Sequence, residues 1–231
     1  MSGFMKTAIV ALAGVYVAVL YLPPLFYQRL TLPPDPFTSL ANTALAASAA
    51  SLLAFPLAVL LGFYIAARGL AAILPFLMFA TAIPHIAVGL MLLPLFIALN
   101  LVDTWPAVIL TMMFVSLPLG VGSIASGLST SVKSLDEFLT SLGVGELSNV
   151  WIHLRAMGVG GAVSFLLMWL RAFSELGALL IVGNRPPTVG VYMFELFQSS
   201  GAETSVPYAL IVATIGIAFS GLLYIISWRR G

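Results

Sequence analysis

The sequence predicts an all-α polytopic membrane protein with six transmembrane helices. Apolar residues make up 61% of the 231 residues, and charged residues only 7%. Soluble domains carry about 25% charged residues, so a surface this poor in charge suits lipid and not water. The length accommodates six spans of about 20 residues with short connections. We therefore expect a single transmembrane domain over residues 1–231.

Six apolar stretches are long enough to cross a bilayer. We place the spans at residues 7–27, 39–67, 70–99, 105–124, 156–182 and 207–228. The first stretch is longer than the core of a secretory signal peptide, so we interpret it as a retained span. The third contains Pro75, Pro84 and Pro94. Proline removes a helix hydrogen bond, so this span is expected to be kinked or broken.

The distribution of basic residues predicts that both termini are cytoplasmic, because Lys and Arg are enriched in cytoplasmic loops. Such an arrangement puts these basic residues inside: Lys6, Arg68, Lys133, Arg155, Arg229 and Arg230. Only Arg29 and Arg185 then lie outside, and Arg171 lies within the membrane. The same arrangement places the charged loop 126–155 in the cytoplasm.

Several functions are disfavoured by composition. The chain has no cysteine and therefore no thiol, disulfide or Cys-ligated metal chemistry. It has no basic stripe, so nucleic acid is not expected as a partner. A membrane-embedded enzyme needs converging acids, bases or metal ligands, whereas the eight acids and two histidines are spread thinly. We assign no catalytic and no metal-binding residue.

The loop 126–155 is expected to form two short helices joined by a turn that contains Gly143 and Gly145. Asp136 and Glu137 are predicted in the first turn of the first helix, where the helix dipole favours acids. Three apolar residues share one side of that helix: Phe138, Leu139 and Leu142. This apolar side either folds back onto the other helices or binds a partner.

The loop resembles the cytoplasmic signature E-A-A-x-x-x-G of the binding-protein-dependent ABC importer permeases of type I. Residues 137–143 read EFLTSLG, and residues 113–139 are similar to the exit of the fourth span in that family. Two further stretches are similar to molybdate and sulfate permeases: ATAIPHIAVGLMLL (80–93) and RAFSELGA (171–178). Residues 188–212, TVGVYMFELFQSSGAETSVPYALIV, resemble the outer loop and last span of molybdate/tungstate permeases.

The chain departs from the family pattern at two places. Phe138 and Leu139 replace the two alanines of the signature. The family's Leu-Pro pair after the signature is replaced by Leu154 and Arg155, and the spacing is one residue shorter. A somewhat different fit to the cytoplasmic partner is therefore expected.

The resemblance implies a transport subunit with the type I importer permease fold and a cytoplasmic coupling loop. The sequence lacks a G-x-x-x-x-G-K-[ST] phosphate-binding loop, so ATP and Mg are expected on a separate ATPase subunit and no cofactor on this chain. The residues implied in coupling to that subunit are Asp136, Glu137, Phe138, Leu139, Leu142, Gly143, Val144 and Gly145.

The other implied partners are an extracytoplasmic substrate-binding protein, a second permease copy in a homodimer, and membrane lipid. The implied location is the plasma membrane of a prokaryote. Import of molybdate or tungstate by alternating access is the expected function. A permease for sulfate or another small solute, and a secondary carrier that works without an ATPase, are the alternatives.

Charged residues inside the fifth span have two interpretations. A continuous helix over 156–182 would put Arg171 and Glu175 on one face, about 24 Å from Arg155. An isolated charge in a bilayer costs roughly 3 kcal/mol or more, so the two should pair. The pair either locks the span to its neighbours or lines a pore or gate. His85, after Pro84, either satisfies a freed carbonyl or belongs to that pathway.

Overall fold

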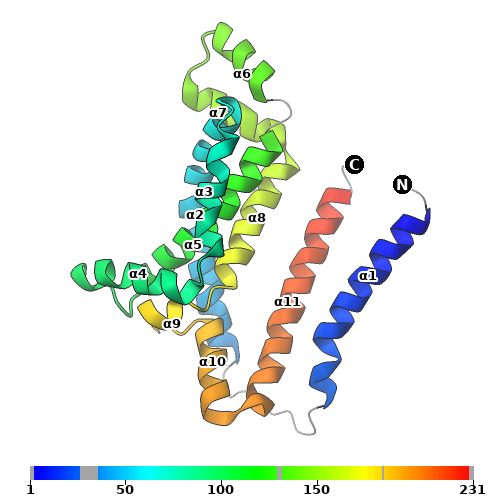
Figure 1. Cartoon of the computed structure of the whole chain (residues 1–231), viewed down its shortest axis with the longest axis vertical. Coiled ribbons are helices and arrows are strands. Elements are labelled where there is room, and N and C mark those ends of the chain that lie inside the picture. The colour runs from blue at the N-terminus through cyan, green and yellow to red at the C-terminus, as the bar shows by residue number, and fades with distance from the viewer. Residues whose placement is uncertain (1–2, 27–35, 129–131, 184, 229–231) are drawn as a thin grey trace. The chain divides into compact units, whose positions relative to one another are not determined.

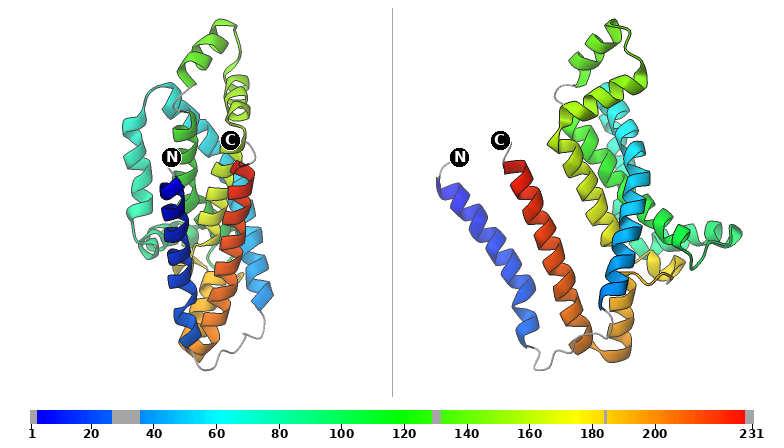
Figure 2. Two further views of the ribbon diagram at one scale, coloured as in Figure 1. Left: turned by 90° about the vertical axis from the view of Figure 1, so that its right-hand side faces the viewer. Right: turned by 180° about the vertical axis from the view of Figure 1, so that it is seen from behind.

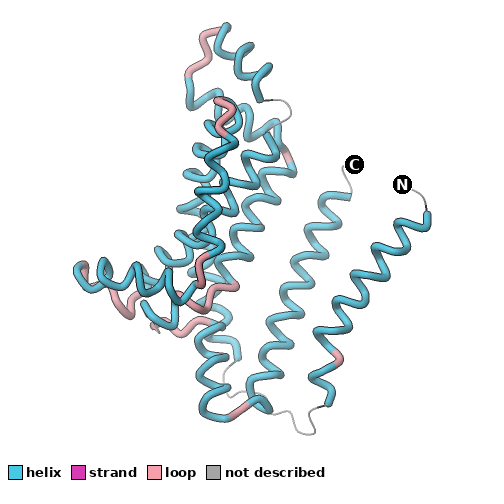
Figure 3. The backbone as a smooth tube through the Cα atoms, in the orientation of Figure 1, coloured by secondary structure: helices cyan, strands magenta, loops and turns pink. Residues whose placement is uncertain are grey.

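The computed structural model describes residues 3–26, 36–128, 132–183 and 185–228. Within these ranges every regular element is a helix (Figure 3). The chain divides into two compact units. One comprises Met1–Pro36 and Met193–Phe219, and the other comprises Phe37–Tyr192 and Ser220–Gly231.

The first unit contains the two terminal helices, α1 (Gly3–Tyr21) and most of α11 (Ala202–Trp228). A short 3-10 helix, η1 (Pro23–Phe26), follows α1, and α10 (Val189–Ser200) leads into α11. A polar contact joins α1 to α11, because Tyr21 Oη and Thr214 Oγ1 lie 3.0 Å apart. The predicted end of the first span at Tyr27 lies outside the described residues, as do Arg29, Arg229 and Arg230.

The second unit is built around three long helices that lie side by side (Figures 1 and 2): α2 (Pro36–Ala67), α5 (Trp105–Leu128) and α8 (Val159–Phe173). Small side chains form a buried stripe on α2: Ala46, Ala47, Ala50, Ala54 and Ala58. Small residues let helix backbones approach closely in lipid, where apolar burial alone does not drive association. Two of these alanines pack with Val121 and Ala125 of α5 and Met168 of α8.

The third predicted span is broken, as the prolines indicated. It consists of η2 (Ala71–Ile73), α3 (Leu74–Ala82) and α4 (His85–Ala98). Ile83 has an extended conformation, with ψ 133°, immediately before Pro84. A proline ring disfavours the helical conformation of the residue that precedes it, which explains why α3 ends here.

The prediction of a continuous helix over residues 156–182 is wrong. α7 (Glu146–Met157) and α8 are separated at Gly158 and meet at an angle of 91°. Gly158 has φ 53° and ψ −114°, a backbone conformation that is strongly disfavoured for residues other than glycine. α8 ends at Phe173, and the short helix α9 (Leu179–Val182) follows a loop. The predicted separation along one axis between Arg155 and Arg171 therefore does not apply.

Three described helices are long and apolar enough to cross a membrane: Phe37–Ala67, Trp105–Leu128 and Ala202–Phe219. The bent pair of α7 and α8 gives a fourth if it counts as one span. The predicted stretches 39–67, 105–124 and 207–228 fall on the first three. These helices are those of a multi-pass membrane protein, and the count of six spans in a single domain stays a prediction.

Candidate functional site

Two short helices lie at one end of the second unit (Figures 1 and 2): α6 (Val132–Ser141) and α7. We call residues 132–157 the foot. The turn between its helices contains Gly143 with φ +73°, a left-handed conformation that favours glycine. Asp136 is the fifth residue of α6, so the prediction that it and Glu137 occupy the first turn is wrong. The helix begins earlier than the acidic pair suggested.

The apolar side of α6 is only partly available to a partner. Phe138 is 59% exposed and Leu142 is 63% exposed, whereas Leu139 is only 8% exposed and packs inward. Of the other predicted coupling residues, Glu137, Gly143 and Gly145 are exposed, and Asp136 and Val144 are partly buried. The foot thus presents two large apolar side chains beside a glycine turn and an acid.

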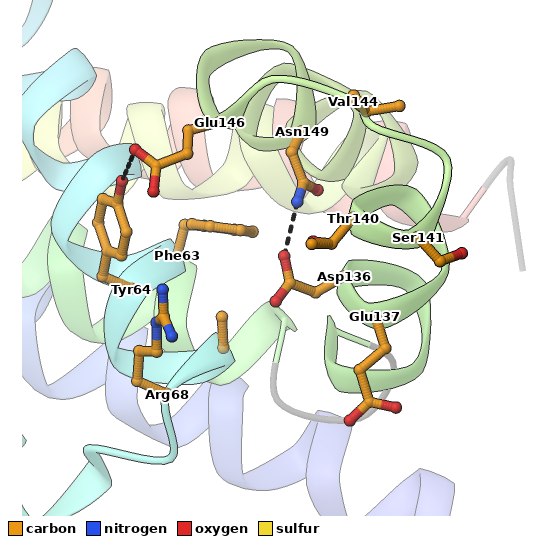
Figure 4. Close-up of a pocket in the computed structure, with 11 residues that line it drawn as sticks. Phe63, Tyr64, Arg68, Asp136, Glu137, Thr140, Ser141, Val144, Glu146 and Asn149 are labelled. Atoms are coloured by element: carbon orange, nitrogen blue, oxygen red, sulfur yellow. Dashed lines mark hydrogen bonds between the residues drawn. The ribbon is translucent and has the colours of Figure 1, made fainter.

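A cleft of about 510 Å³ separates the foot from the end of α2 (Figure 4). Asn149 Nδ2 donates a 2.6 Å hydrogen bond to Asp136 Oδ1, which joins α7 to α6. Tyr64 Oη donates a 3.2 Å hydrogen bond to Glu146 Oε2, which joins the foot to α2. Arg68 points into the cleft, and Glu137 points away from the Asp136–Asn149 bond (Figure 4). The lining is acidic, since Asp136, Glu137 and Glu146 outnumber Arg68.

Sequence reasoning missed the residues that hold the foot together. His153 is 1% exposed, and its Nδ1 and Nε2 lie 3.0 Å from Asn149 O and 3.3 Å from Val132 O. Its ring also packs edge-on against Phe63 of α2, with ring centroids 5.0 Å apart. The available signal was the spacing of four between Asn149 and His153, which puts both on the side of α7 that carries buried Val150.

A second polar group lies at the end of α8 away from the foot and combines all three residues predicted for a pore or gate. Arg171 Nη2 lies 3.1 Å from Glu175 Oε2, and His85 Nδ1 lies 3.0 Å from the same oxygen. Arg171 Nη2 also lies 2.6 Å from His85 Nε2. We call His85, Arg171 and Glu175 the triad. The pairing of Arg171 with Glu175 forms although α8 ends between them.

Arg171 Nη2 is the hydrogen-bond partner of both ring nitrogens of His85, at 3.0 Å from Nδ1 and 2.6 Å from Nε2. The other oxygen of Glu175, Oε1, accepts a 2.8 Å hydrogen bond from the Ala178 backbone N–H. Glu175 is completely buried, and both of its oxygens have partners.

The broken ends of two spans pack closely at the triad. A Cβ added to Gly177 would lie 2.8 Å from His85 Cβ, and one added to Gly89 would lie 2.7 Å from Ala178 O. Ala178 also packs with Val88 of α4 and Val115 of α5. The start of α4 is therefore held against the loop between α8 and α9 by both packing and charge.

The polar residues of α2 make contacts between segments. Asn42 Nδ2 donates to Pro187 O at 3.2 Å, and Thr43 Oγ1 accepts from Val189 N at 2.7 Å. Ser48 Oγ accepts from Trp169 Nε1 at 3.0 Å. Hydrogen bonds of this kind hold helices together in lipid. Within the described ranges, no group of three or more His, Asp and Glu side chains could hold a metal ion.

Apolar helices, broken spans and buried charges define a multi-pass membrane protein, and similarity to known proteins identifies its family. No protein-family model matches the chain. The molybdate/tungstate transport system permease protein WtpB of Pyrococcus furiosus is 31% identical over 83% of this chain and 78% of its own length. The protein of the same name from Thermococcus kodakarensis is 28% identical over 97% of this chain and 93% of its own length. That from Pyrococcus abyssi is 29% identical over 84% of this chain and 78% of its own length.

This chain belongs to the family of molybdate/tungstate transport permeases. It is thus a permease subunit of an ABC transport system, as its resemblance to the importer permeases implied. Its relatives are named as permeases, which agrees with a transport subunit and not with an enzyme.

Proposed function

We propose that this chain forms the membrane pathway of an ATP-driven importer for a tetrahedral oxyanion, with molybdate or tungstate as substrate. Family membership supports this proposal most directly, because relatives at 28–31% identity over most of the chain carry that name. An extracytoplasmic binding protein delivers the anion. Two permease copies form the pore between them, surrounded by lipid, in the plasma membrane of a prokaryote.

Six spans with both termini in the cytoplasm belong to this proposal. Three single helices of sufficient length, the 15-residue helix α8, the broken pair α3–α4 and the 19-residue helix α1 supply the segments. This topology places the foot on the cytoplasmic side, together with Arg68 and Lys133 at its edge.

The foot is the proposed docking element for a separate ATPase subunit that binds ATP and Mg. The observation that supports this role is the exposure of Phe138 and Leu142, at 59% and 63%, beside the exposed acid Glu137. Large exposed apolar side chains at a polar rim are typical of protein interfaces. Closure of the ATP-bound subunits then moves the foot and switches the access of the pore.

The test is reconstitution of the full complex, with its ATPase and binding protein, in proteoliposomes. Wild type is expected to accumulate molybdate and tungstate only when ATP is present. Accumulation of sulfate in preference to both anions would show that the chain is a sulfate permease. Accumulation of molybdate or tungstate without any ATPase would show that it is a secondary carrier.

Two variants test the foot. Gly143→Asp and Glu137→Lys are expected to abolish co-purification of the ATPase and uptake, while the permease still inserts in the membrane. Gly201→Asp and Glu203→Lys are matched controls for ATPase attachment. Gly143 and Gly201 have φ +73° and +78°, and a Cβ at either would meet nothing within 4 Å. If ATPase attachment and uptake survive both foot variants, the coupling role of the foot is refuted.

A further inference from the structure

The triad joins two spans that are both interrupted. His85 is the first residue of α4, directly after the break at Ile83 and Pro84. Arg171 lies in the last turn of α8, and Glu175 lies in the loop that follows. Interrupted helices at membrane depth occur where the backbone is buried in protein or lines a cavity. The position of the triad alone is therefore compatible with either a structural lock or a transport path.

The exposure of the three side chains favours the path. The side chain of Glu175 is 0% exposed, whereas those of Arg171 and His85 are 17% and 31% exposed. The negative charge is thus innermost, and the cation and the imidazole reach the surface. A lock that only neutralised two charges would not require this order.

The Arg171 guanidinium also has N–H donors that the triad does not use. Within the described part of the chain, Arg171 makes its side-chain hydrogen bonds through Nη2 alone. Nη1 and Nε remain for another acceptor, and the planar guanidinium fork matches the oxygens of an oxyanion. Two oxygens of a tetrahedral anion could therefore approach the exposed side of Arg171 while Glu175 holds the other side.

We infer that the Glu175 carboxylate is a resident anion, which a transported tetrahedral oxyanion replaces at Arg171 as it passes. This inference rests on the proposed function and assigns its anion contact. At rest, Glu175 accepts a hydrogen bond from Arg171 and lies 3.0 Å from His85 Nδ1, so the two broken spans stay joined. When an oxyanion takes the guanidinium, Glu175 keeps its backbone bond to Ala178 N, 2.8 Å away, and α4 separates from the loop after α8.

The close packing at Gly177 and Gly89 couples this exchange of anions at Arg171 to a movement of α4. His85 Cβ and Ala178 O lie where side chains on these glycines would have to be, so the triad cannot part without moving α4. Occupancy of Arg171 by substrate and opening between the two spans are thus linked. Glu175 serves as the closed-state ligand, and Arg171 contacts the substrate.

The test measures passive anion flux through the full permease–ATPase complex in proteoliposomes loaded with molybdate, sulfate or sucrose, without ATP. Glu175→Gln removes the resident charge and keeps the shape, so passive molybdate and sulfate efflux should rise at least about tenfold, as expected for loss of a charge-assisted hydrogen bond. The double variant Arg171→Gln with Glu175→Gln should lose this flux. Glu203→Gln, at an exposed acid of α11, is the matched control.

Each result has a defined meaning. Efflux of both anions but not of sucrose from Glu175→Gln vesicles, dependent on Arg171, supports the exchange. Equal efflux of sucrose, or unchanged anion efflux with a lower unfolding temperature, shows a structural lock and overturns it. Arg171→Lys keeps the positive charge but removes the planar guanidinium, and should therefore reduce ATP-driven uptake. Normal uptake by this variant with lower stability also overturns the exchange. ATP-driven uptake by wild type tests the proposed function separately.

Discussion

At the scale of single residues, close approach to Gly177 determines how α4 sits against the loop after α8. Gly177→Ala would place a Cβ 2.8 Å from His85 Cβ and 3.1 Å from Ile86 N. Overpacking of this kind typically costs about 1–3 kcal/mol. We expect a lower unfolding temperature in detergent. Gly14→Ala is the control, since a Cβ there meets nothing within 4 Å. Equal stability of both variants would show that this contact relaxes freely.

Also at the residue scale, the Asp136–Asn149 hydrogen bond can be tested by exchange of the two side chains. Asn149→Asp would put two carboxylates at a site where donor and acceptor are now 2.6 Å apart. Loss of the bond is expected to destabilise the foot by about 1–3 kcal/mol and to weaken ATPase co-purification. Adding Asp136→Asn restores one donor and one carboxylate, so attachment should recover. Failure of this rescue would indicate another role for Asp136.

At the scale of elements, Gly158 fixes the right angle between α7 and α8. Its φ of 53° and ψ of −114° would cost a residue with a side chain on the order of 1–3 kcal/mol. Gly158→Ala is therefore expected to lower stability and uncouple uptake from ATP hydrolysis, measured as ATP consumed per molybdate imported. In the control Gly160→Ala, the new Cβ would lie 3.5 Å from the Met157 methyl, an ordinary contact. A coupling ratio unchanged by Gly158→Ala would contradict this role.

The elements also show which signals in the sequence were sufficient. Runs of apolar residues located α2, α5 and α11 well, and the three prolines of residues 70–99 predicted a kink or break, which falls directly before α4. The bend at Gly158 and the end of α8 at Phe173 were missed, because an apolar run has the same composition whether its axis is straight or bent. Likewise, Arg171 and Glu175 could be paired from their spacing, but His85 joins them only through the tertiary contact of α4.

At the scale of the whole molecule, sidedness can be measured directly because the chain has no cysteine of its own. Leu142→Cys, at an exposed position of the foot, should react with a membrane-impermeant maleimide only from the cytoplasmic side. Arg185→Cys, also exposed, should react only from the opposite side. The unmodified chain is the blank. Labelling of both from one side would refute the proposed topology, as would protection of position 142 by lipid.

The right angle at Gly158 has a consequence for how force could travel through this subunit. From Gly158, α7 extends about 18 Å to its start, and α8 extends about 20 Å to Arg171, at a rise of 1.5 Å per residue. If α7 and α8 rotate together about Gly158 as one rigid body, a displacement at the start of α7 produces a perpendicular displacement of about the same size at Arg171. A thrust of about 1 Å on α7 would then shift Arg171 by about 1 Å, enough to stretch a contact of 3.1 Å beyond hydrogen-bonding distance.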